Sequence, residues 1–249
     1  MEFSPLIRKL EHLYPLSDDE KDVLQGAFVN VVSFASDQDI IREDDCPHSC
    51  NLLLEGMVCR YVDMPNGKRQ ILSFHTPGDI FDAQSFMIEK MDHSVGTLTA
   101  CKIAVLPHRV MKEITEQYPR IARAIWKDTL VDAAIFRQWI ANVGRRNAKQ
   151  RIAHLLCEIY TRFDVIGMTH DATIMWPLTQ SELADATGLS TIHVNRTLQE
   201  LRAEKLISLE RGKLHVLDWA GLKSAGEFDA NYLHVIQLPG RVVPSALPE

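Results

Sequence analysis

Residues 28–106 show short apolar runs separated by turn residues, a pattern typical of β-strands rather than helices. Pro65-Asn66-Gly67 predicts a hairpin turn, and Pro77-Gly78-Asp79 predicts a second turn. Several short strands at close spacing predict a small β-barrel or roll. The predicted strands are Ile40–Ile41, Leu52–Leu54, Met57–Tyr61, Gln70–Phe74 and Thr97–Leu106.

From Arg120 to Val143 the pattern changes to apolar residues at intervals of three to four, without glycine or proline. This period predicts one long amphipathic helix, and Gly144 with the basic pair after it predicts its end and a hinge. Such a helix beside a β domain needs a cover for its apolar stripe, so we expect it to pair with the same helix of a second chain. Packing on its own barrel is the alternative. The expected dimer residues are Ile121, Ala124, Val131 and Ile135.

The segment 148–217 predicts helices followed by a hairpin. A helix is expected over 148–162, and a short one over 179–187 that opens with the capping box Thr179-Gln180-Ser181-Glu182. Gly188 predicts a tight turn, and Ser190 can cap a third helix that runs to about Glu204. Two short apolar runs, 206–209 and 214–217, then predict a β-hairpin. Together these elements form a winged helix-turn-helix.

The second helix of the helix-turn-helix, which Ser190 caps, has side chains that can read DNA. A solvated polar face is the alternative interpretation. The apolar positions of this helix form one core with Leu183 and Ala184, which leaves a polar face outward. Arginine suits guanine, asparagine suits adenine, and an isoleucine or threonine methyl can touch the thymine methyl. The apolar core positions of that helix are Val194, Leu198 and Leu201. The predicted contacts to bases or phosphates are Thr179, Ser190, Thr191, Ile192, Asn195, Arg196, Gln199, Arg211 and Lys213.

Composition narrows the class of protein. The chain is 46% hydrophobic and 24% charged, which is globular, and its net charge of -6 argues against nucleic acid at first. The whole acidic excess lies in residues 1–144, however, and 145–220 is nearly neutral, so we expect specific, weakly electrostatic DNA binding. No apolar run reaches the ~18 residues of a membrane span, and few cysteines indicate a reducing cytoplasm. No G-x-S-x-G, P-loop or H-E-x-x-H motif occurs, so we predict that the chain is not an enzyme.

Two segments resemble the CRP/FNR superfamily of bacterial transcription regulators. Residues 178–201 are similar to the helix-turn-helix of that family, and Pro77-Gly-Asp-Ile-Phe81 resembles the start of its cyclic-nucleotide-binding cassette. The resemblance implies an α+β fold with a jelly-roll-like β-roll sensor domain, a dimerisation helix and a winged helix. It also implies a homodimer on a pseudo-palindromic site in double-stranded DNA, with RNA polymerase as a partner. The expected ranges are 1–118 for the sensor, 119–144 for the helix and hinge, 145–220 for the winged helix and 221–249 for a C-terminal tail.

The residues that hold cAMP in that family are changed here. Asp82-Ala83-Gln84 stands in place of Gly-Glu-Leu, His93-Ser94 in place of Arg-Ser, and Phe136-Arg137 in place of Thr-Ser. A phosphate needs a fixed cation, and Asp82 would repel it, so we expect a signal other than cAMP, such as another small molecule. The candidate effector pocket is Asp82, Gln84, His93, Ser94, Phe136 and Arg137. Surface or pocket positions are expected for His75, His93 and His108.

The sequence predicts no cofactor, neither cAMP, an iron–sulfur cluster nor haem. No cysteine precedes Cys46, so the N-terminal cluster of the oxygen-sensing members is missing, and Cys59 and Cys101 lie in strand-like apolar runs. A redox pair of Cys46 and Cys50 is an alternative to buried, incidental thiols. The Pro-containing end of the tail, residues 238–249, is expected to be extended, with packing of the tail into the pocket or onto a sister subunit as the alternative. A small-ligand module whose winged helix contacts proteins is the alternative function.

Overall fold

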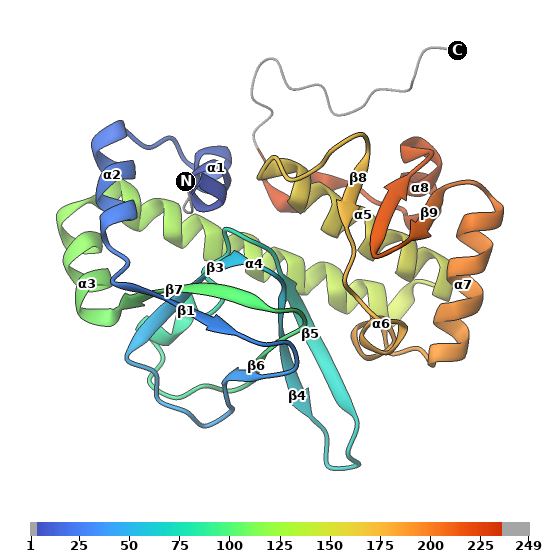
Figure 1. Cartoon of the computed structure of the whole chain (residues 1–249), viewed down its shortest axis with the longest axis horizontal. Coiled ribbons are helices and arrows are strands. Elements are labelled where there is room, and N and C mark those ends of the chain that lie inside the picture. Colours follow the sequence, from blue (N-terminus) through green and yellow to red (C-terminus); the bar gives the residue numbers. More distant parts are fainter. Residues whose placement is uncertain (1–3, 236–249) are drawn as a thin grey trace. The chain divides into compact units, whose positions relative to one another are not determined.

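The protein was examined as a computed structural model, in which residues 4–235 are described, and its α+β fold class is as predicted (Figure 1). The chain divides into two compact units, and the boundary lies between Ala133 and Ala134. That boundary falls inside a long helix that the sequence treats as one connecting segment, 119–144. Residues 119–133 of this helix therefore belong to the first unit and residues 134–145 to the second.

The first unit is a β-roll with helices before and after its strands. Helices α1 (Ser4–Leu13) and α2 (Asp18–Gly26) precede the strands, and α3 (His108–Gln117) follows them. One antiparallel sheet has the order β1-β7-β3 and the other the order β2-β6-β4-β5. In Figure 1, the three helices gather at one end of these sheets. The strands are β1 (Asn30–Phe34), β2 (Asp39–Ile41), β3 (Ser49–Glu55), β4 (Val58–Asp63), β5 (Arg69–His75), β6 (Ser94–Thr97) and β7 (Cys101–Pro107).

The predicted strands between residues 40 and 74 correspond to β2–β5, but the single strand predicted over 97–106 is wrong. Thr97 pairs with Val58 in one sheet, whereas Cys101 pairs with Phe34 in the other. The chain crosses between the sheets at 98–100, and this crossing breaks the apolar run into β6 and β7. The sequence also missed β1, whose residues are largely exposed.

Two apolar layers stabilise this unit. Leu53, Val58 and Phe81 belong to a cluster inside the roll, whereas Leu52 belongs to a second cluster shared with the surrounding helices. Adjacent residues of β3 therefore point to opposite faces, as the two-residue period of a strand requires. Ile121 joins the second cluster, so the long helix completes the core of its own roll.

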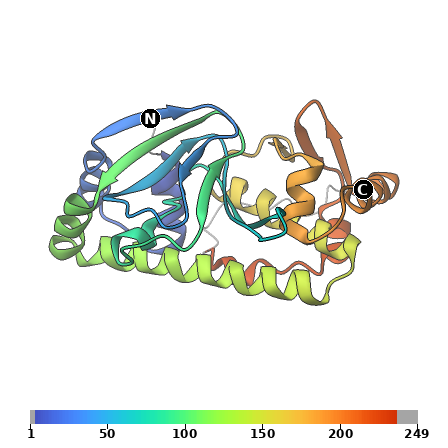
Figure 2. The same ribbon diagram turned by 90° about the horizontal axis from the view of Figure 1, so that it is seen from below.

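The long helix α4 (Pro119–Arg145) is longer than predicted (Figure 2). It runs through Gly144, which does not end it. The side chain of Arg151 on α5 (Ala148–Val165) donates to the carbonyls of Val143 and Arg146, at 2.9 and 3.0 Å. These bonds satisfy acceptors that a helix end leaves open, so the helix continues to Arg145 before the chain turns.

The predicted dimer residues Ile121, Ala124, Val131 and Ile135 are at most 7% exposed, so they cannot face a second chain. Ile121 and Ala124 lie in the core formed with α1 and α3. For Ile121 and Ala124 the structure agrees with the alternative interpretation, in which the helix packs on its own barrel. The sequence pattern identified an apolar stripe but could not say which partner covers it.

The second unit is the predicted winged helix-turn-helix. Beside α5 it contains α6 (Gln180–Thr187), α7 (Thr191–Ala203) and a sheet of order β8-β10-β9. Strands β9 (Ile207–Glu210) and β10 (Lys213–Val216) form the predicted hairpin, and β8 (Thr173–Met175) was not predicted.

The predicted tail, 221–249, begins with helical structure as far as Leu233. That part of the chain forms α8 (Trp219–Gly226) and the 3-10 helix η2 (Ala230–Leu233). Tyr232 of η2 donates a 2.7 Å hydrogen bond to Glu158, a carboxylate buried on α5. Trp139 donates to the other oxygen of the same carboxylate, at 3.1 Å. These bonds fix the segment on α5, and residues 236–249 of the predicted tail lie outside the described residues.

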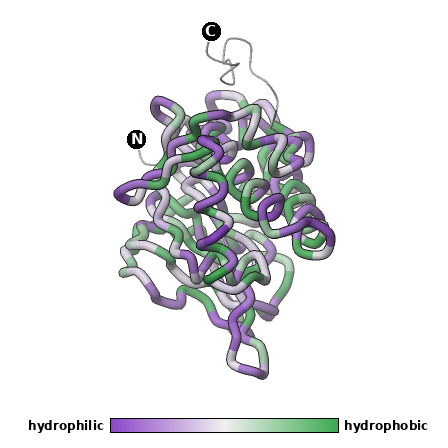
Figure 3. Tube along the Cα trace, turned by 90° about the vertical axis from the view of Figure 1, so that its right-hand side faces the viewer, coloured by the Kyte–Doolittle hydropathy of each residue, from purple (hydrophilic) through white to green (hydrophobic). Residues whose placement is uncertain are grey.

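No helix within residues 4–235 combines the length and the apolar character of a membrane span. Hydrophobic and hydrophilic stretches alternate along the trace (Figure 3).

Two buried histidines predict a loss of stability in acid. Burial, and then the charge of Arg60, lowers the pKa of His75 to about 4, and burial lowers the pKa of His154 to about 4. The unfolded chain takes up these protons near pH 6.5, so it binds more protons than the folded chain below that pH. The contribution is complete above pH ~6.5 and falls by up to about 1.4 kcal/mol per pH unit and histidine toward pH 4. Urea unfolding at pH 7.5 and 5.0 measures this slope, and His75→Gln should flatten it; an equal slope in both proteins would contradict the assignment.

Candidate nucleic-acid interface and sensor site

The helix-turn-helix is held by the local interactions that the sequence predicts. Thr179 accepts from the backbone N–H of Glu182 at 3.2 Å, and the Glu182 carboxylate accepts from the backbone N–H of Thr179 at 2.6 Å, which closes the capping box. Gly188 has φ +65°, a left-handed conformation that glycine adopts without strain. Ser190 caps α7 by accepting from the N–H of His193 at 3.3 Å. Three local features, namely the capping box, the glycine turn and the serine cap, therefore determine how α6 leads into α7.

The predicted core of this unit is confirmed. Leu183 and Ala184 of α6 are buried, and so are Val194, Leu198 and Leu201 of α7. With these side chains inside, the opposite face of α7 is presented to solvent. Ile192 is 79% exposed and the Arg196 side chain 70%. Thr191 and Gln199 are exposed on the same helix.

Asn195 differs from the other predicted base contacts. It is half-buried, and its side-chain amide donates a 3.1 Å hydrogen bond to Oε1 of Gln180 on α6. One of the two donors of the amide is thus engaged with α6, whereas bidentate reading of adenine uses one donor and the carbonyl oxygen. Gln180 was not among the predicted contacts, and neither was His193, which is exposed in the first turn of α7. The capping-box motif places Gln180 in the first turn of α6, and this position could have indicated that Gln180 lies near the DNA-facing side.

The wing carries two basic side chains at its turn. Arg211 and Gly212 have φ +51° and +72°, which are the left-handed values of a two-residue hairpin turn, and Glu210 pairs with Lys213 across it. Arg211 and Lys213 are exposed. The turn therefore presents their charges outward, as contact with DNA phosphates needs.

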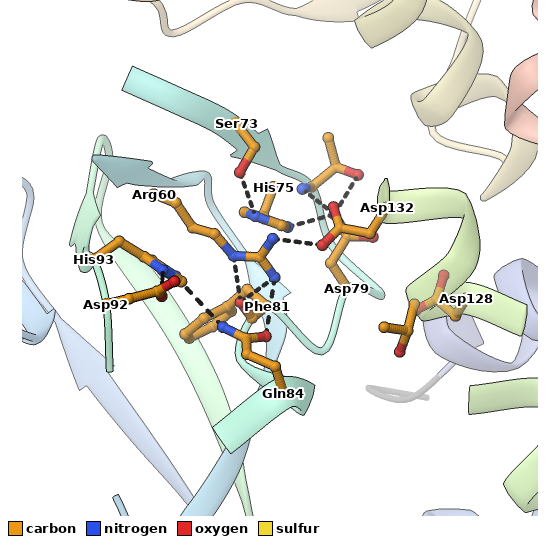
Figure 4. A network of polar contacts seen from close by, with 12 residues as sticks. Arg60, Ser73, His75, Asp79, Phe81, Gln84, Asp92, His93, Asp128 and Asp132 are labelled. Atoms are coloured by element: carbon orange, nitrogen blue, oxygen red, sulfur yellow. Dashed lines mark hydrogen bonds and ion pairs between the residues drawn. The ribbon is translucent and has the colours of Figure 1, made fainter. Parts of the chain in front are cut away.

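In the first unit, Arg60 of β4 is a buried cation that the sequence analysis missed (Figure 4). Its Nε and Nη2 donate to the carbonyl of Phe81 at 2.9 and 2.7 Å, and Nη1 donates to Asp132 on α4. Gln84 Oε1 lies 3.4 Å from Nη2. A single arginine inside the apolar strand run 57–61 was the available signal, because an unpaired charge is not tolerated in a core.

The structure brings only some of the predicted pocket residues into contact. Gln84 and His93 approach to 3.4 Å, whereas Ser94 accepts from the backbone N–H of Glu43 at 3.0 Å. Asp82 is fully buried and accepts from the backbone and side-chain amides of Asn51, at 2.6 and 2.7 Å. Phe136 is half-buried and Arg137 exposed, both on the part of α4 that belongs to the second unit.

The electrostatics of His93 give a phosphate no fixed cation. Burial, and then the charge of Arg60, lowers the pKa of His93, so its ring is neutral near pH 7. Burial raises the pKa of Asp82 to about 7, so this carboxyl repels a phosphate less than the sequence predicts. His75, expected at the surface or in the pocket, is instead buried and lies 2.9 Å from Ser73 Oγ.

The cysteines do not converge within the described part of the chain. Cys46 is exposed, whereas Cys50, Cys59, Cys101 and Cys157 are buried free thiols. Burial raises the pKa of Cys50 to about 12, which disfavours the thiolate that a redox pair with Cys46 would need. No group of three potential metal ligands forms within residues 4–235.

Comparisons with known proteins match one family model to each unit. Residues 31–118 match the model of the cyclic nucleotide-binding domain, and residues 150–225 match that of the Crp-like helix-turn-helix domain. The nitrogen fixation regulation protein FixK of Bradyrhizobium diazoefficiens is 27% identical over 78% of this chain and 80% of its own. The transcriptional activatory protein AadR of Rhodopseudomonas palustris is 28% identical over 75% of this chain and 77% of its own. The transcriptional activator protein FnrL of Cereibacter sphaeroides is 26% identical over 78% of this chain and 80% of its own.

Solved structures show the same fold. FixK2 from Bradyrhizobium japonicum superposes with a TM-score of 0.70 at 19% identity, over 79% of this chain and 96% of that protein. A nucleotide-binding-like roll, a long helix and a Crp-like helix-turn-helix in one chain define a DNA-binding transcription regulator. The chain belongs to the CRP/FNR superfamily.

Proposed function

We propose that this regulator binds a pseudo-palindromic DNA site as a homodimer, with one α7 in the major groove of each half-site. The observation that carries this proposal is the outward face of α7, where Ile192 and Arg196 are exposed beside the N-cap Ser190. Such a helix start meets base edges, and arginine reads guanine. Family resemblance supports RNA polymerase as a partner.

A second stripe on α4 supports pairing with a second copy of the chain. Trp126, Leu130 and Ile140 are 67%, 54% and 73% exposed. With Ala133 and Arg137 they follow one another at intervals of four, three, four and three residues. That spacing is the heptad seam of a coiled coil, in which each helix covers the stripe of the other. Large apolar side chains repeated along one helix face are best covered by an identical helix.

The signal is proposed to be something other than cAMP. Ala83 lacks a carboxylate for a ribose, and a neutral His93 gives a phosphate no fixed cation. Isothermal calorimetry of the full chain with cAMP should show no binding at micromolar concentrations. Micromolar binding that His93→Ala or Ser94→Ala abolishes would contradict this proposal.

DNA binding is tested by a gel-shift titration of promoter fragments, repeated at several salt concentrations. We expect specific complexes whose affinity falls with salt by a shallow slope, because few basic side chains reach phosphates. Binding that is equal for promoter and scrambled DNA would exclude sequence-specific regulation. It would favour the alternative, a ligand-binding module whose winged helix contacts proteins.

A further inference from the structure

Two ion pairs, one helical turn apart, connect the N-terminal half of α4 to the roll within the first unit. Lys9 Nζ of α1 lies 2.7 Å from Asp79 Oδ1 and 2.7 Å from Asp128 Oδ1 on α4. Arg60 of β4 contacts Asp132, four residues further along α4. Asp79 follows the Pro77-Gly78 turn that opens the cassette, so both pairs link this segment to α4.

Arg60 holds the cassette and the helix with one rigid group. Its guanidinium donates twice to the carbonyl of Phe81 and reaches Gln84, while Nη1 contacts Asp132 (Figure 4). The fork of a guanidinium is planar, so its donors cannot move independently. A shift of the Phe81 backbone must therefore either carry Asp132 with it or break the ion pair.

The charges around the pair favour an anion at the position of Asp132. Burial opposes its ionisation, but the charge of Arg60 lowers the pKa of Asp132 below its usual value. His75 lies 2.9 Å from Ser73 Oγ and 3.5 Å from Asp79, and burial keeps it neutral. The side chain of Arg60 is 5% exposed and that of Asp132 27%. Removing the carboxylate would leave a desolvated cation, a costly arrangement.

We propose that Asp132 serves as an internal anionic ligand of the sensor. Its carboxylate pairs with the Arg60 guanidinium and so couples the cassette to α4 without an external ligand. An anionic effector of the carboxylate class would act by displacing Asp132 from Arg60. The coupling itself is independent of DNA, and only its effect on operator affinity rests on the proposed function.

Chemical rescue tests the site. In Asp132→Ala the removed group leaves room for formate or acetate, so we expect a lower melting temperature than in the parent chain. Millimolar formate should then raise it by several degrees, whereas chloride at the same ionic strength should not. Asp128→Ala is the matched control on the same helix face, because Lys9 keeps Asp79 there, and formate should have no effect on it. In Arg60→Met/Asp132→Ala the cation is also gone, and formate should again have no effect.

Operator affinity gives the second readout. Asp132→Asn keeps the size of the side chain, so this variant is expected to fold. We expect it to bind operator DNA at least fivefold more weakly than the parent chain. Formate should restore the affinity of Asp132→Ala but not that of the double variant. Unchanged affinity in Asp132→Asn, or a destabilised Asp132→Ala that formate does not stabilise, would overturn the proposal. If the parent chain itself binds no DNA, the proposed function fails. The melting-temperature measurements with formate still test whether Asp132 acts as the anion of Arg60.

Discussion

Arg196→Ala is expected to lower the affinity of the regulator for its operator by about 1–3 kcal/mol per half-site. A dimer loses this contribution twice, which corresponds to a decrease from about thirtyfold to above ten-thousandfold. The physical reason is the position of Arg196 on the exposed face of α7, where its guanidinium pairs only loosely with Glu200, at 3.5 Å. An exposed ion pair of this kind is weak, so the guanidinium of Arg196 can leave Glu200 and bind a guanine edge instead.

Arg202→Ala is the matched control for that measurement. It removes the same charge from the same helix, but from its last turn, where Arg202 Nε donates to the Leu198 carbonyl at 3.2 Å. Fluorescence anisotropy with operator and mutated operator should show a loss of base preference only for Arg196→Ala. A similar, sequence-independent loss in both variants would mean that Arg196 contacts phosphate and does not read a base.

The DNA-reading half was predictable from sequence because short-range devices fix it. The box of Thr179 and Glu182, the turn at Gly188 and the cap at Ser190 each act within a few residues, and all three are present. Such signals survive without knowledge of the rest of the fold. The Gln180–Asn195 hydrogen bond spans 15 residues of sequence, and no local pattern encodes it.

The sensor half was predicted only in outline. Alternation of apolar and polar residues indicated strands, but not the crossing at 98–100, because a change of sheet leaves no local mark. Arg60 was missed for a similar reason: its partner Asp132 is 72 residues away and becomes visible only when β4 meets α4. The helix α8 was missed because its stability comes from packing on α5, where His154 Nδ1 lies 3.1 Å from the carbonyl oxygen of Gly226.

The two apolar stripes on α4 show that a correctly recognised helical period does not by itself identify the dimer interface. Ile121 and Ala124 repeat with a helical period and are more uniformly apolar than the second stripe, so pattern alone favours them. They are fully buried in the roll, whereas Trp126 and Leu130 are exposed. An amphipathic pattern identifies a buried face, and only the tertiary structure says whether its own domain already covers it.

Trp126→Glu/Leu130→Glu is accordingly expected to convert the proposed dimer into a monomer. Two carboxylates facing their own copies in a coiled-coil seam repel one another and remove large apolar contacts. A monomer reads one half-site, so operator affinity should fall by about 10²–10⁴-fold, because the second half-site is no longer bound at high effective concentration. Analytical ultracentrifugation at micromolar concentration measures the mass, and circular dichroism checks the fold. Met87→Glu introduces the same charge at an 80% exposed apolar position outside the α4 sequence and should leave the mass unchanged. A double variant that stays dimeric would place the contact elsewhere than on this stripe, and the intact α7 heads would then still bind both half-sites.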